Sequence, residues 1–225
     1  MTLTPKLLSF DVFGTLSSVR DSSYGAFARI LRDAGAPHVD VKTFWEAWEE
    51  RNIESYWAPY RPYKDICHDS LAATFAAFGI NGDPRTISYY FDAFSGFNLY
   101  PDVLDTLETL SRRFKLAIVS NIDDDLLAAT RLPRTFDLVC TAERARGYKP
   151  DGTLFRYLLA NAGVGRDDIL HSGQSQFTDM VGAKPLGLMV AWINRRGVEL
   201  STKVPRPDYQ VPDLASLIPI VMPAL

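Results

Sequence analysis

The sequence predicts an α/β protein in which a helical cap domain is inserted into a parallel-sheet core. Two patterns in the chain carry this prediction. From residue 101 onward, short apolar runs alternate with segments of helical periodicity, which is typical of a parallel sheet covered by helices on both faces. Residues 17–95 show helical periodicity alone. We therefore expect a core made of residues 1–16 and 97–225 and a cap made of residues 17–96.

The cap is expected to hold four helices. Apolar side chains recur at helical spacing in three segments, which end near Gly35, Ile53 and Gly79. A fourth helix is predicted from Pro84 to about Phe94, because proline suits the first turn of a helix. The chain would cross between cap and core twice, near residues 16–20 and 96–101, and such a pair of crossings can act as a hinge.

The core begins with a strand in the apolar run Leu7–Phe10. Helices and strands then alternate from Asp102 to the end of the chain, which predicts a Rossmann-like sheet. The expected helices cover residues 102–114, 126–131, 154–162, 179–186 and 213–218. The expected strands cover residues 115–121, 136–140, 169–172, 188–193 and 209–211.

Composition narrows the class of protein. The chain has 225 residues and a formal net charge of −3, which argues against a nucleic-acid partner. Cys67 and Cys140 are its only cysteines, so we expect no disulfide framework and a reducing compartment. No apolar run reaches membrane-spanning length, and residues 1–6 lack the pattern of a signal peptide. These observations predict a cytoplasmic protein that contacts neither nucleic acid nor membrane.

Asp11 ends the first strand, and Gly14 and Thr15 then turn the chain. Burying an unpaired carboxylate costs several kcal/mol or shifts its pKa, so this position needs an explanation. Asp11 is either an ordinary turn residue or a reactive group at the end of a strand. The other strand ends favour the second interpretation.

Reactive or hydrogen-bonding side chains also follow later strands of the predicted sheet. They are Ser120, Asn121, Lys149 and the segment from Gln174 to Asp179. In an open parallel sheet, ligands bind beyond the carboxyl ends of the strands, so we expect these groups to meet around Asp11. The set suits attack by Asp11 on an electrophilic centre, with Asn121 donating to the leaving group and water later hydrolysing a covalent ester.

Each partner of Asp11 has an expected task. Lys149 would keep Asp11 ionised, since a nearby cation lowers a carboxylate pKa by about 1–3 units. Ser120 and Thr15 would donate hydrogen bonds to Asp11 and leave one of its oxygens free to attack. Asp179 would orient Lys149 or activate the hydrolytic water.

Taken singly, these residues also have ordinary structural explanations. Ser120-Asn121 is common turn chemistry, and Lys149-Pro150-Asp151 is a typical helix start. His171 lies inside a strand, where a buried core histidine is more typical than a catalytic one. The tryptophans and tyrosines between residues 45 and 63 are typical of cap packing, with some members lining a pocket. The order of the polar groups on successive strand ends nevertheless favours a site.

Four motifs in the chain match a known family. They are Asp11-Val12-Phe13-Gly14-Thr15-Leu16, Val119-Ser120-Asn121, Tyr148-Lys149-Pro150-Asp151 and Asp179-Met180-Val181-Gly182-Ala183-Lys184. With these motifs the chain resembles the haloacid dehalogenase-like (HAD) superfamily over nearly its whole length. Within it, the chain is similar to the type II 2-haloacid dehalogenases, because Phe13 stands where the phosphatase relatives carry a second aspartate that serves as general acid.

The resemblance implies that Asp11 displaces halide from a 2-haloalkanoic acid and that water hydrolyses the resulting ester to a 2-hydroxy acid of inverted configuration. It implies Asp11, Lys149 and Asp179 as catalytic residues. It also implies a helical cap over a site that needs no metal and no cofactor. The matched positions expected to bind the small-molecule substrate are Thr15, Ser120 and Asn121.

One departure from this branch lies in the cap. The branch has an arginine directly after a tryptophan, which helps to bind halide and the substrate carboxylate. In this chain Glu49 follows Trp48. Arg51 or Arg61 is the candidate to replace that arginine, and we expect Trp48 and Arg51 to contact the substrate.

A second departure lies in the last motif, where Gln174 and Gln176 replace a usual serine and asparagine; we expect both to bind substrate. Gln174 also stands where many phosphatase relatives place an acid of their magnesium site, which leaves Asp11 and Asp179 as carboxylate ligands. A magnesium-dependent phosphate-ester hydrolase is therefore one alternative. A catalytically silent member that binds a ligand or a protein is another. A homodimer formed through exposed aromatic side chains of the cap is a further expectation.

Overall fold

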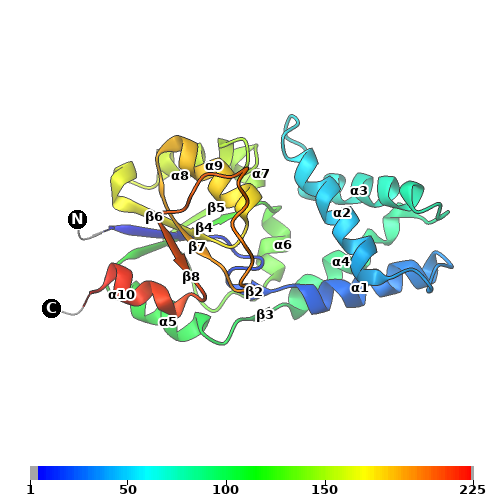
Figure 1. Ribbon diagram of the computed structural model, residues 1–225, viewed down its shortest axis with the longest axis horizontal. Coiled ribbons are helices and arrows are strands. Elements are labelled where there is room, and N and C mark those ends of the chain that lie inside the picture. The colour runs from blue at the N-terminus through cyan, green and yellow to red at the C-terminus, as the bar shows by residue number, and fades with distance from the viewer. Residues whose placement is uncertain (1–4, 224–225) are drawn as a thin grey trace.

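The structure, a computed structural model, describes residues 5–223 and consists of a layered core beside a helical cap (Figure 1). The strands are β1 Leu7–Phe10, β2 Ser17–Ser18, β3 Asn98–Leu99, β4 Lys115–Ser120, β5 Leu138–Thr141, β6 Ile169–Gly173, β7 Met189–Ile193 and β8 Tyr209–Val211. The α-helices are α1 Arg20–Asp33, α2 Val41–Ser55, α3 Tyr63–Ala77, α4 Ser88–Asp92, α5 Val103–Ser111, α6 Asp124–Ala129, α7 Ala142–Ala145, α8 Thr153–Asn161, α9 Val181–Ala183 and α10 Ile218–Val221. Among the described residues, no helix is long and apolar enough to cross a membrane. The N-terminal segment expected to lack a signal peptide falls largely outside these residues.

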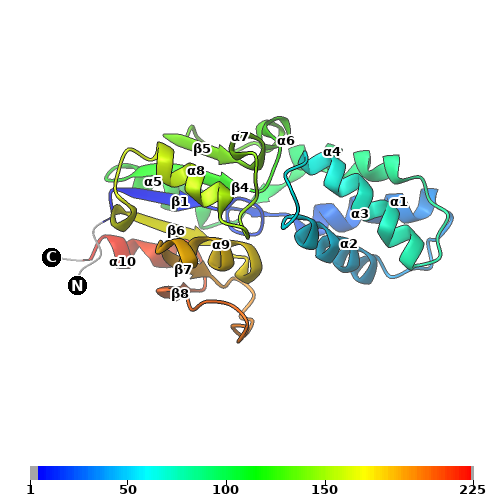
Figure 2. The ribbon, with the colours of Figure 1, turned by 90° about the horizontal axis from the view of Figure 1, so that it is seen from above.

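Six parallel strands form the core sheet in the order β5-β4-β1-β6-β7-β8. The chain runs from β1 to β4 and β5 on one side and returns to β6, β7 and β8 on the other, so the strand order reverses at β1. Helices α8 and α9 cover one face of the sheet, and α5 and α10 cover the other (Figures 1 and 2). The predicted α/β fold with a parallel sheet is confirmed, and the carboxyl end of β1 lies where ligands bind in such sheets.

The strands are apolar on both sides because both faces of the sheet are covered. Along β4, Leu116 and Ile118 pack with the cluster under α5 and α10, whereas Ala117 and Val119 pack with the cluster under α8 and α9. This alternation follows from the two-residue period of a strand. The continuous apolar runs that predicted buried strands therefore have a direct explanation in the layers.

The cap consists of α1 to α4 around an aromatic centre. The rings of Phe27, Trp48 and Tyr90 pack against one another, with Phe27 centroid distances of 4.8 Å to Trp48 and 5.8 Å to Tyr90 and a Trp48–Tyr90 distance of 5.0 Å. Helix α2 begins after Asp40, whose carboxylate accepts the backbone N–H of Thr43, as expected of a capping residue. The single helix expected from Pro84 to Phe94 is wrong in detail, because 3₁₀ turns precede and follow the five-residue α4.

Two crossings connect the cap with the core. Their backbones pair as the antiparallel strands β2 and β3, with Ser17 opposite Leu99 and Ser18 opposite Asn98. The sequence predicted only helices for the segment that begins at residue 17. This is wrong for its first two residues, which form β2. The boundaries after residues 16 and 96 remain predictions; they fall beside this ribbon.

A second contact between cap and core lies away from the ribbon. The carboxylate of Asp123 accepts the backbone N–H groups of Tyr63 and Lys64 at the start of α3, at 2.9 and 3.0 Å. Tyr148 of the core stacks on Tyr56 of the cap, with ring centroids 4.6 Å apart. These contacts hold the cap over the carboxyl ends of the strands.

The last motif differs most from its expected secondary structure. Instead of one helix over residues 179–186, the chain forms a π-helical turn at Gln176–Met180, the short α9 and a 3₁₀ turn at Lys184–Leu186. The backbone N–H of Ser175 donates to the Asp179 carboxylate at 3.0 Å, which holds this irregular turn in place. Helix α7 was not expected, and the closing helix begins later than residue 213, as a 3₁₀ turn that leads into α10.

Candidate functional site

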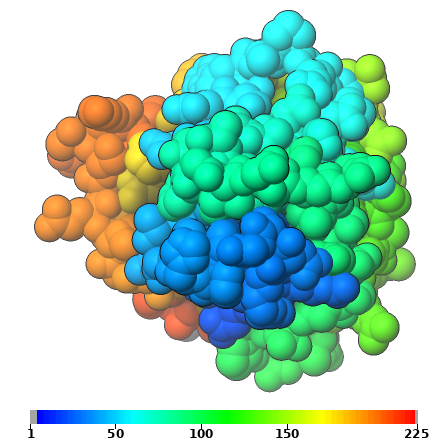
Figure 3. Space-filling model, turned by 90° about the vertical axis from the view of Figure 1, so that its right-hand side faces the viewer, coloured from blue at the N-terminus to red at the C-terminus, as the bar shows by residue number. Residues whose placement is uncertain are grey.

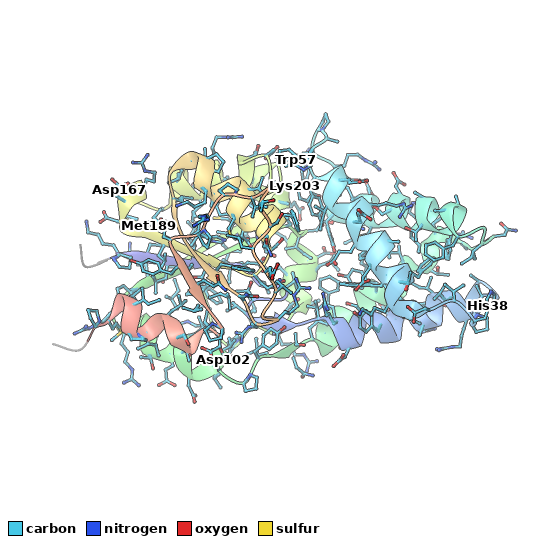
Figure 4. All side chains as sticks on the ribbon, in the orientation of Figure 1. His38, Trp57, Asp102, Asp167, Met189 and Lys203 are labelled. Atoms are coloured by element: carbon cyan, nitrogen blue, oxygen red, sulfur yellow. The ribbon has the colours of Figure 1, made fainter. Side chains whose placement is uncertain are left out.

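A cleft of about 860 Å³ lies between the cap and the carboxyl ends of the core strands. Its volume is in the range of small-molecule sites. Asp11, Ser120 and Lys149 lie on the core side, and residues of α2 line the cap side. Figure 3 shows the orange loop that follows β7 projecting beside the blue and cyan segments of the cap. Trp57 of the cap and Lys203 of that loop mark one edge of the cleft (Figure 4).

Three charged side chains from separate motifs meet at the end of β1. The Lys149 ammonium contacts Asp11 Oδ1 at 2.5 Å and Asp179 Oδ1 at 2.8 Å. All three side chains are at most 9 % exposed, so water does little to screen their charges. Asp11 and Lys149 line the cleft, whereas Asp179 lies behind Lys149 and is fully buried. The structure thus brings together the three residues that the sequence nominated.

Asp179 is held from several directions. Its Oδ1 also lies 3.2 Å from His171 Nε2, and His171 Nδ1 lies 3.0 Å from Ser9 Oγ. Ser9, His171 and Asp179 are all fully buried. With the Ser9 hydroxyl donating to Nδ1, the imidazole carries its proton on Nε2 and donates to the carboxylate. His171 is therefore the satisfied core histidine that its position in a strand predicted, and it also holds Asp179.

Burial and neighbouring charges shift the pKa values of Asp11 and Asp179 in opposite directions. Burial and the charge of Asp179 raise the pKa of Asp11, despite Lys149 and Thr15. The pKa of Asp179 is held below its usual range: burial acts against this, but Lys149 and His171 outweigh it. For Lys149, burial is outweighed by the two carboxylates, which raise its pKa. Lys149 lowers the pKa of Asp11, as expected, but burial is the larger effect, and the net shift is upward.

The turn after β1 is shaped around Asp11. Thr15 Oγ1 donates to Asp11 Oδ2 at 2.7 Å and accepts the backbone N–H of Gln174 at 2.9 Å. Gly14 has a φ of 87°, and a Cβ atom there would lie 2.8 Å from Oε1 of Gln174. Glycine is required at this position because of both its conformation and the closeness of the glutamine. Thr15 holds Asp11 as expected, and Gln174 borders the cleft above the turn.

Ser120 and Asn121 lie beside Asp11 but do not bond to it. The expected hydrogen bond from Ser120 to Asp11 is absent, and the buried Ser120 hydroxyl has no partner among the described residues. The carboxylate oxygens of Asp11 are instead bonded to Lys149 and Thr15, so neither is left entirely free. Asn121 Oδ1 accepts the backbone N–H of Lys149 at 2.9 Å. Both Ser120 and Asn121 line the cleft.

Other predicted substrate contacts are used elsewhere. Gln176 reaches the cleft, but its amide donates to the Glu199 carbonyl and accepts the Ser201 N–H, so it fastens the neighbouring loop. The Arg51 guanidinium donates to the Ala47 carbonyl of its own helix at 2.6 Å and does not line the cleft. Nearby backbone atoms thus bond both groups, and substrate binding by Gln176 and Arg51 stays a prediction.

Two further cap predictions have a mixed outcome. Trp48 borders the cleft but is 2 % exposed, and its indole N–H donates to the Cys67 carbonyl at 3.1 Å. Arg61, the other substitute for the missing arginine, pairs with Asp69 at 2.7 Å and lies outside the cleft lining. Most cap aromatics are buried, with Trp57 an exception, so exposed aromatics give little support to the expected homodimer.

The sequence argument missed several charged residues of the cleft wall. Arg20, at the start of α1, and Arg196, in the loop after β7, line the cleft together with Glu49 of α2. Lys203 lies at the edge, also in the loop after β7.

The donor set does not fit magnesium. A magnesium site requires oxygen ligands in near-octahedral geometry, with one or two carboxylates. Here the Lys149 ammonium lies between Asp11 and Asp179, the two carboxylates that could serve, and Gln174 offers only an amide. Within residues 5–223 no group of three histidine, cysteine or acidic side chains is placed to hold a metal ion.

Comparisons with known proteins agree with this architecture. A family model described as haloacid dehalogenase-like hydrolase matches residues 9–193. An (S)-2-haloacid dehalogenase from Pseudomonas sp. (strain YL) is 27% identical over 223 residues, covering 95% of this chain and 93% of that one. A phosphoserine phosphatase from Thermus thermophilus is 26% identical, covering 79% of this chain and 72% of its own.

The fold is also that of a solved structure. The L-2-haloacid dehalogenase from Xanthobacter autotrophicus superposes with a TM-score of 0.83 at 24% identity, covering 99% of this chain and 100% of that chain. The motifs, the sheet with its helical cap, and the match to the family model over most of the chain lead to the same assignment. The chain belongs to the haloacid dehalogenase-like hydrolases.

Proposed function

We propose that this hydrolase is a 2-haloacid dehalogenase that uses Asp11 as its nucleophile and works without a metal. The observation that carries the proposal is the Lys149 ammonium, which lies between the cleft-facing Asp11 and the buried Asp179. A divalent cation would compete with Lys149 for the same carboxylates. The likeness to the (S)-2-haloacid dehalogenase of Pseudomonas over nearly the whole chain supports the same substrate class.

The proposed reaction has two steps. In the first, an oxygen of ionised Asp11 attacks C2 of the 2-haloacid from the side opposite the halogen, and the halide leaves with the bonding electron pair. In the second, water attacks the carbonyl carbon of the Asp11 ester, which releases a 2-hydroxy acid, restores the carboxylate and liberates a proton. Attack from the opposite side inverts the configuration at C2.

Other residues hold the groups that react. Lys149 and Thr15 each bond one oxygen of Asp11, which fixes the plane of the carboxylate. Asp179, fully buried behind Lys149, acts as a positioning residue for the ammonium. Ser120 borders the cleft, and its buried hydroxyl has no partner among the described residues, so a bound substrate could supply one. Asn121 accepts a hydrogen bond through Oδ1, and its side-chain N–H groups are available to the leaving halide.

Halide release tests the proposal directly. Wild-type protein is incubated with 2-chloro and 2-bromo acids in the presence of a chelator, next to Asp11→Asn. We expect release by the wild type alone, with unchanged circular dichroism for the variant. Activity of Asp11→Asn comparable to the wild type would refute Asp11 as the nucleophile, and loss of wild-type activity in chelator would refute metal independence.

Isotope labelling tests the ester intermediate. In a single turnover with enzyme in excess in H₂¹⁸O, water attacks the ester at the Asp11 carbonyl carbon. The label should therefore enter the Asp11 carboxylate, and mass spectrometry of the peptide containing Asp11 should show it. Label found in the hydroxyl group of the product, with an unlabelled peptide, would mean direct attack by water on the substrate.

The similarity to a phosphoserine phosphatase makes phosphate-ester hydrolysis the competing function. Release of phosphate from phosphate esters that needs magnesium, without any halide release, would favour a phosphate-ester hydrolase. Phe13, which has no acid–base group, stands two residues after the proposed nucleophile. The absence of a general acid there typically costs about 10²–10⁴-fold, which favours halide as the leaving group because it needs no proton.

A further inference from the structure

The cleft contains a charged cluster at some remove from the buried Lys149 pair. It is formed by Arg20 at the start of α1, Glu49 of α2, and Arg196 of the loop after β7, and all three line the cleft. Two of these residues belong to the cap and one to the core, so the cluster draws on both sides of the cleft. We call Arg20, Glu49 and Arg196 the outer cluster.

The guanidinium groups of the outer cluster are available to a ligand. Neither Arg20 nor Arg196 forms a salt bridge or hydrogen bond with a side chain or carbonyl in the described part of the chain. The Arg20 guanidinium lies 5.7 Å from the ring centroid of Trp45, which supports it from one side. Arg195 differs, because it pairs with Asp102 at 2.9 Å and donates to the Thr15 carbonyl.

Glu49 does not neutralise the two arginines fully. Burial raises the pKa of its carboxyl to about 7, although Arg20 and Arg196 act in the opposite direction. The pKa of Arg196 is lowered, by burial and by the charge of Arg20. Two guanidinium groups that repel one another, beside a carboxyl group that takes up a proton near neutral pH, form a site that an anion would stabilise.

The other titratable groups around Glu49 leave this balance intact. Burial raises the pKa values of Tyr56 and Tyr90 far above neutrality, so neither loses a proton near pH 7. Glu46, on the same helix, is exposed and lies 4.0 Å from Lys42. Water and salt screen such exposed charges. Glu50 and Glu54 are also exposed on this helix, and all three glutamates border the cleft, where their charges are screened more than that of Glu49.

The cleft has room for a ligand longer than a three-carbon haloacid. A volume of about 860 Å³ lies near the upper end of the range for small-molecule sites. Asp11, at the floor, and the outer cluster border the same cleft. Building on the proposed dehalogenase function, we propose that the outer cluster binds a second anionic group of the substrate. The substrate is then a 2-halogenated dicarboxylic acid, whose distal carboxylate lies between Arg20 and Arg196.

Binding of two acids without halogen tests this subsite separately from the chemistry. Hexanedioate and hexanoate have the same chain length and differ in the distal carboxylate, and calorimetry measures their Kd values. We expect hexanedioate to bind the wild type at least about tenfold more tightly, as charge-assisted hydrogen bonds allow. Arg20→Gln and Arg196→Gln should each remove most of this advantage. Arg29→Gln is the matched control, because Arg29 stacks on Tyr89 away from the cleft.

The pH dependence gives a second test. A bound anion favours protonated Glu49, so the Kd for hexanedioate should increase by up to about tenfold between about pH 6 and about pH 8. Glu49→Gln imitates the protonated form and should bind hexanedioate tightly across this range. Hexanoate serves as the control for titration at the floor of the cleft, and its Kd should not change with Glu49→Gln.

The outcomes separate the subsite from the reaction. No detectable hexanedioate binding, equal Kd values for the two acids, or an advantage that survives Arg20→Gln and Arg196→Gln would overturn the subsite. Halide release from 2-bromohexanoate and 2-bromohexanedioate is measured separately. Release with equal kcat/KM for both would leave the dehalogenase function standing and refute the subsite. Tight hexanedioate binding without any halide release would support the anion subsite and refute the reaction.

Discussion

Replacement of Lys149 by methionine tests how the buried charges of the site are balanced. Methionine keeps much of the apolar stem and removes the ammonium group. Asp11 and Asp179, whose side chains are 9 % and 0 % exposed, then lose the cation they share. His171 still contacts Asp179, but no other lysine or arginine in the described residues forms an ion pair with either carboxylate.

The structure places the expected cost in the range for buried ion pairs. Removing one partner of such a pair typically costs about 3–5 kcal/mol, because the remaining charge is uncompensated. Lys149 is 2 % exposed and holds two carboxylates, at 2.5 and 2.8 Å, so we expect the upper part of this range. The loss of about 4 kcal/mol at neutral pH would be a large fraction of a typical unfolding free energy of about 5–15 kcal/mol.

The contribution of Asp179 to the pH dependence of stability should change sign. In the wild type, the lowered pKa of Asp179 contributes stability above its unfolded value of about 3.9, and this contribution is lost as pH falls through the folded value. In Lys149→Met, burial without the cation raises both carboxyl pKa values above their unfolded values. The folded variant then binds more protons than the unfolded chain. Its stability should therefore rise by up to about 1.4 kcal/mol per pH unit and per proton as pH falls from about 7 to about 5.

Urea unfolding followed by circular dichroism at several pH values measures both effects. Lys184→Met is the matched control, because Lys184 pairs with Asp208 at 2.7 Å but the two side chains are 21 % and 35 % exposed. We expect the control to lose about 1 kcal/mol or less. A loss below about 1 kcal/mol for Lys149→Met at neutral pH, or a variant whose stability does not rise as pH falls from about 7 to about 5, would refute the reasoning.

Three further predictions follow from individual contacts. His171→Leu removes a hydrogen bond to ionised Asp179 and should lower the unfolding free energy, measured with urea, by about 1.5–3 kcal/mol. His171→Gln retains a donor and should lower it by less. Equal losses for the two variants would contradict the role of that donor. Gly182→Ala would place a Cβ atom 1.8 Å from a backbone carbonyl oxygen and should lower the unfolding free energy by at least about 2 kcal/mol. Gly25→Ala, in open space within α1, should raise the unfolding free energy by about 0.5–1 kcal/mol. Thermal unfolding of both variants measures the contrast, and similar unfolding free energies would contradict it. Because the pKa of Asp11 is raised, the kcat/KM for halide release should decline on acidification through a pKa above the ordinary 3.8, and a pH profile that stays flat down to that value would contradict the raised pKa.

Periodicity alone was sufficient for most of the fold. Apolar runs buried on both faces, such as Leu116 to Val119, and the alternation of helices and strands indicated a parallel sheet with a helical insert. These signals are local, because the side-chain period of a strand or helix is visible within a few residues. The π-helical turn at Gln176–Met180 was missed, since its conformation depends on a hydrogen bond from Ser175 to Asp179 within the site.

The meeting of Asp11, Lys149 and Asp179 was also predictable. Each follows a strand of one parallel sheet, and the carboxyl ends of such strands share an edge. Side-chain orientation was not predictable at the same level. Ser120 does not bond to the Asp11 carboxylate, which instead accepts hydrogen bonds from Thr15 and Lys149. Arg51 donates to a backbone carbonyl of its own helix. Which competing partner satisfies a polar group depends on distances of a few tenths of an ångström, and these are set only by packing.

What the sequence determined by itself was the family, the sheet with its cap and the buried charge pair, because these follow from local patterns and from motifs on strand ends. What only the tertiary structure decided was the electrostatics of the cleft. Arg20, Glu49 and Arg196 are far apart in the chain and meet only when the cap lies over the core. The effect of Lys149 on the pKa of Asp11 was predictable, but its net rise was not, because burial is a property of the folded chain and here outweighs the neighbouring ammonium.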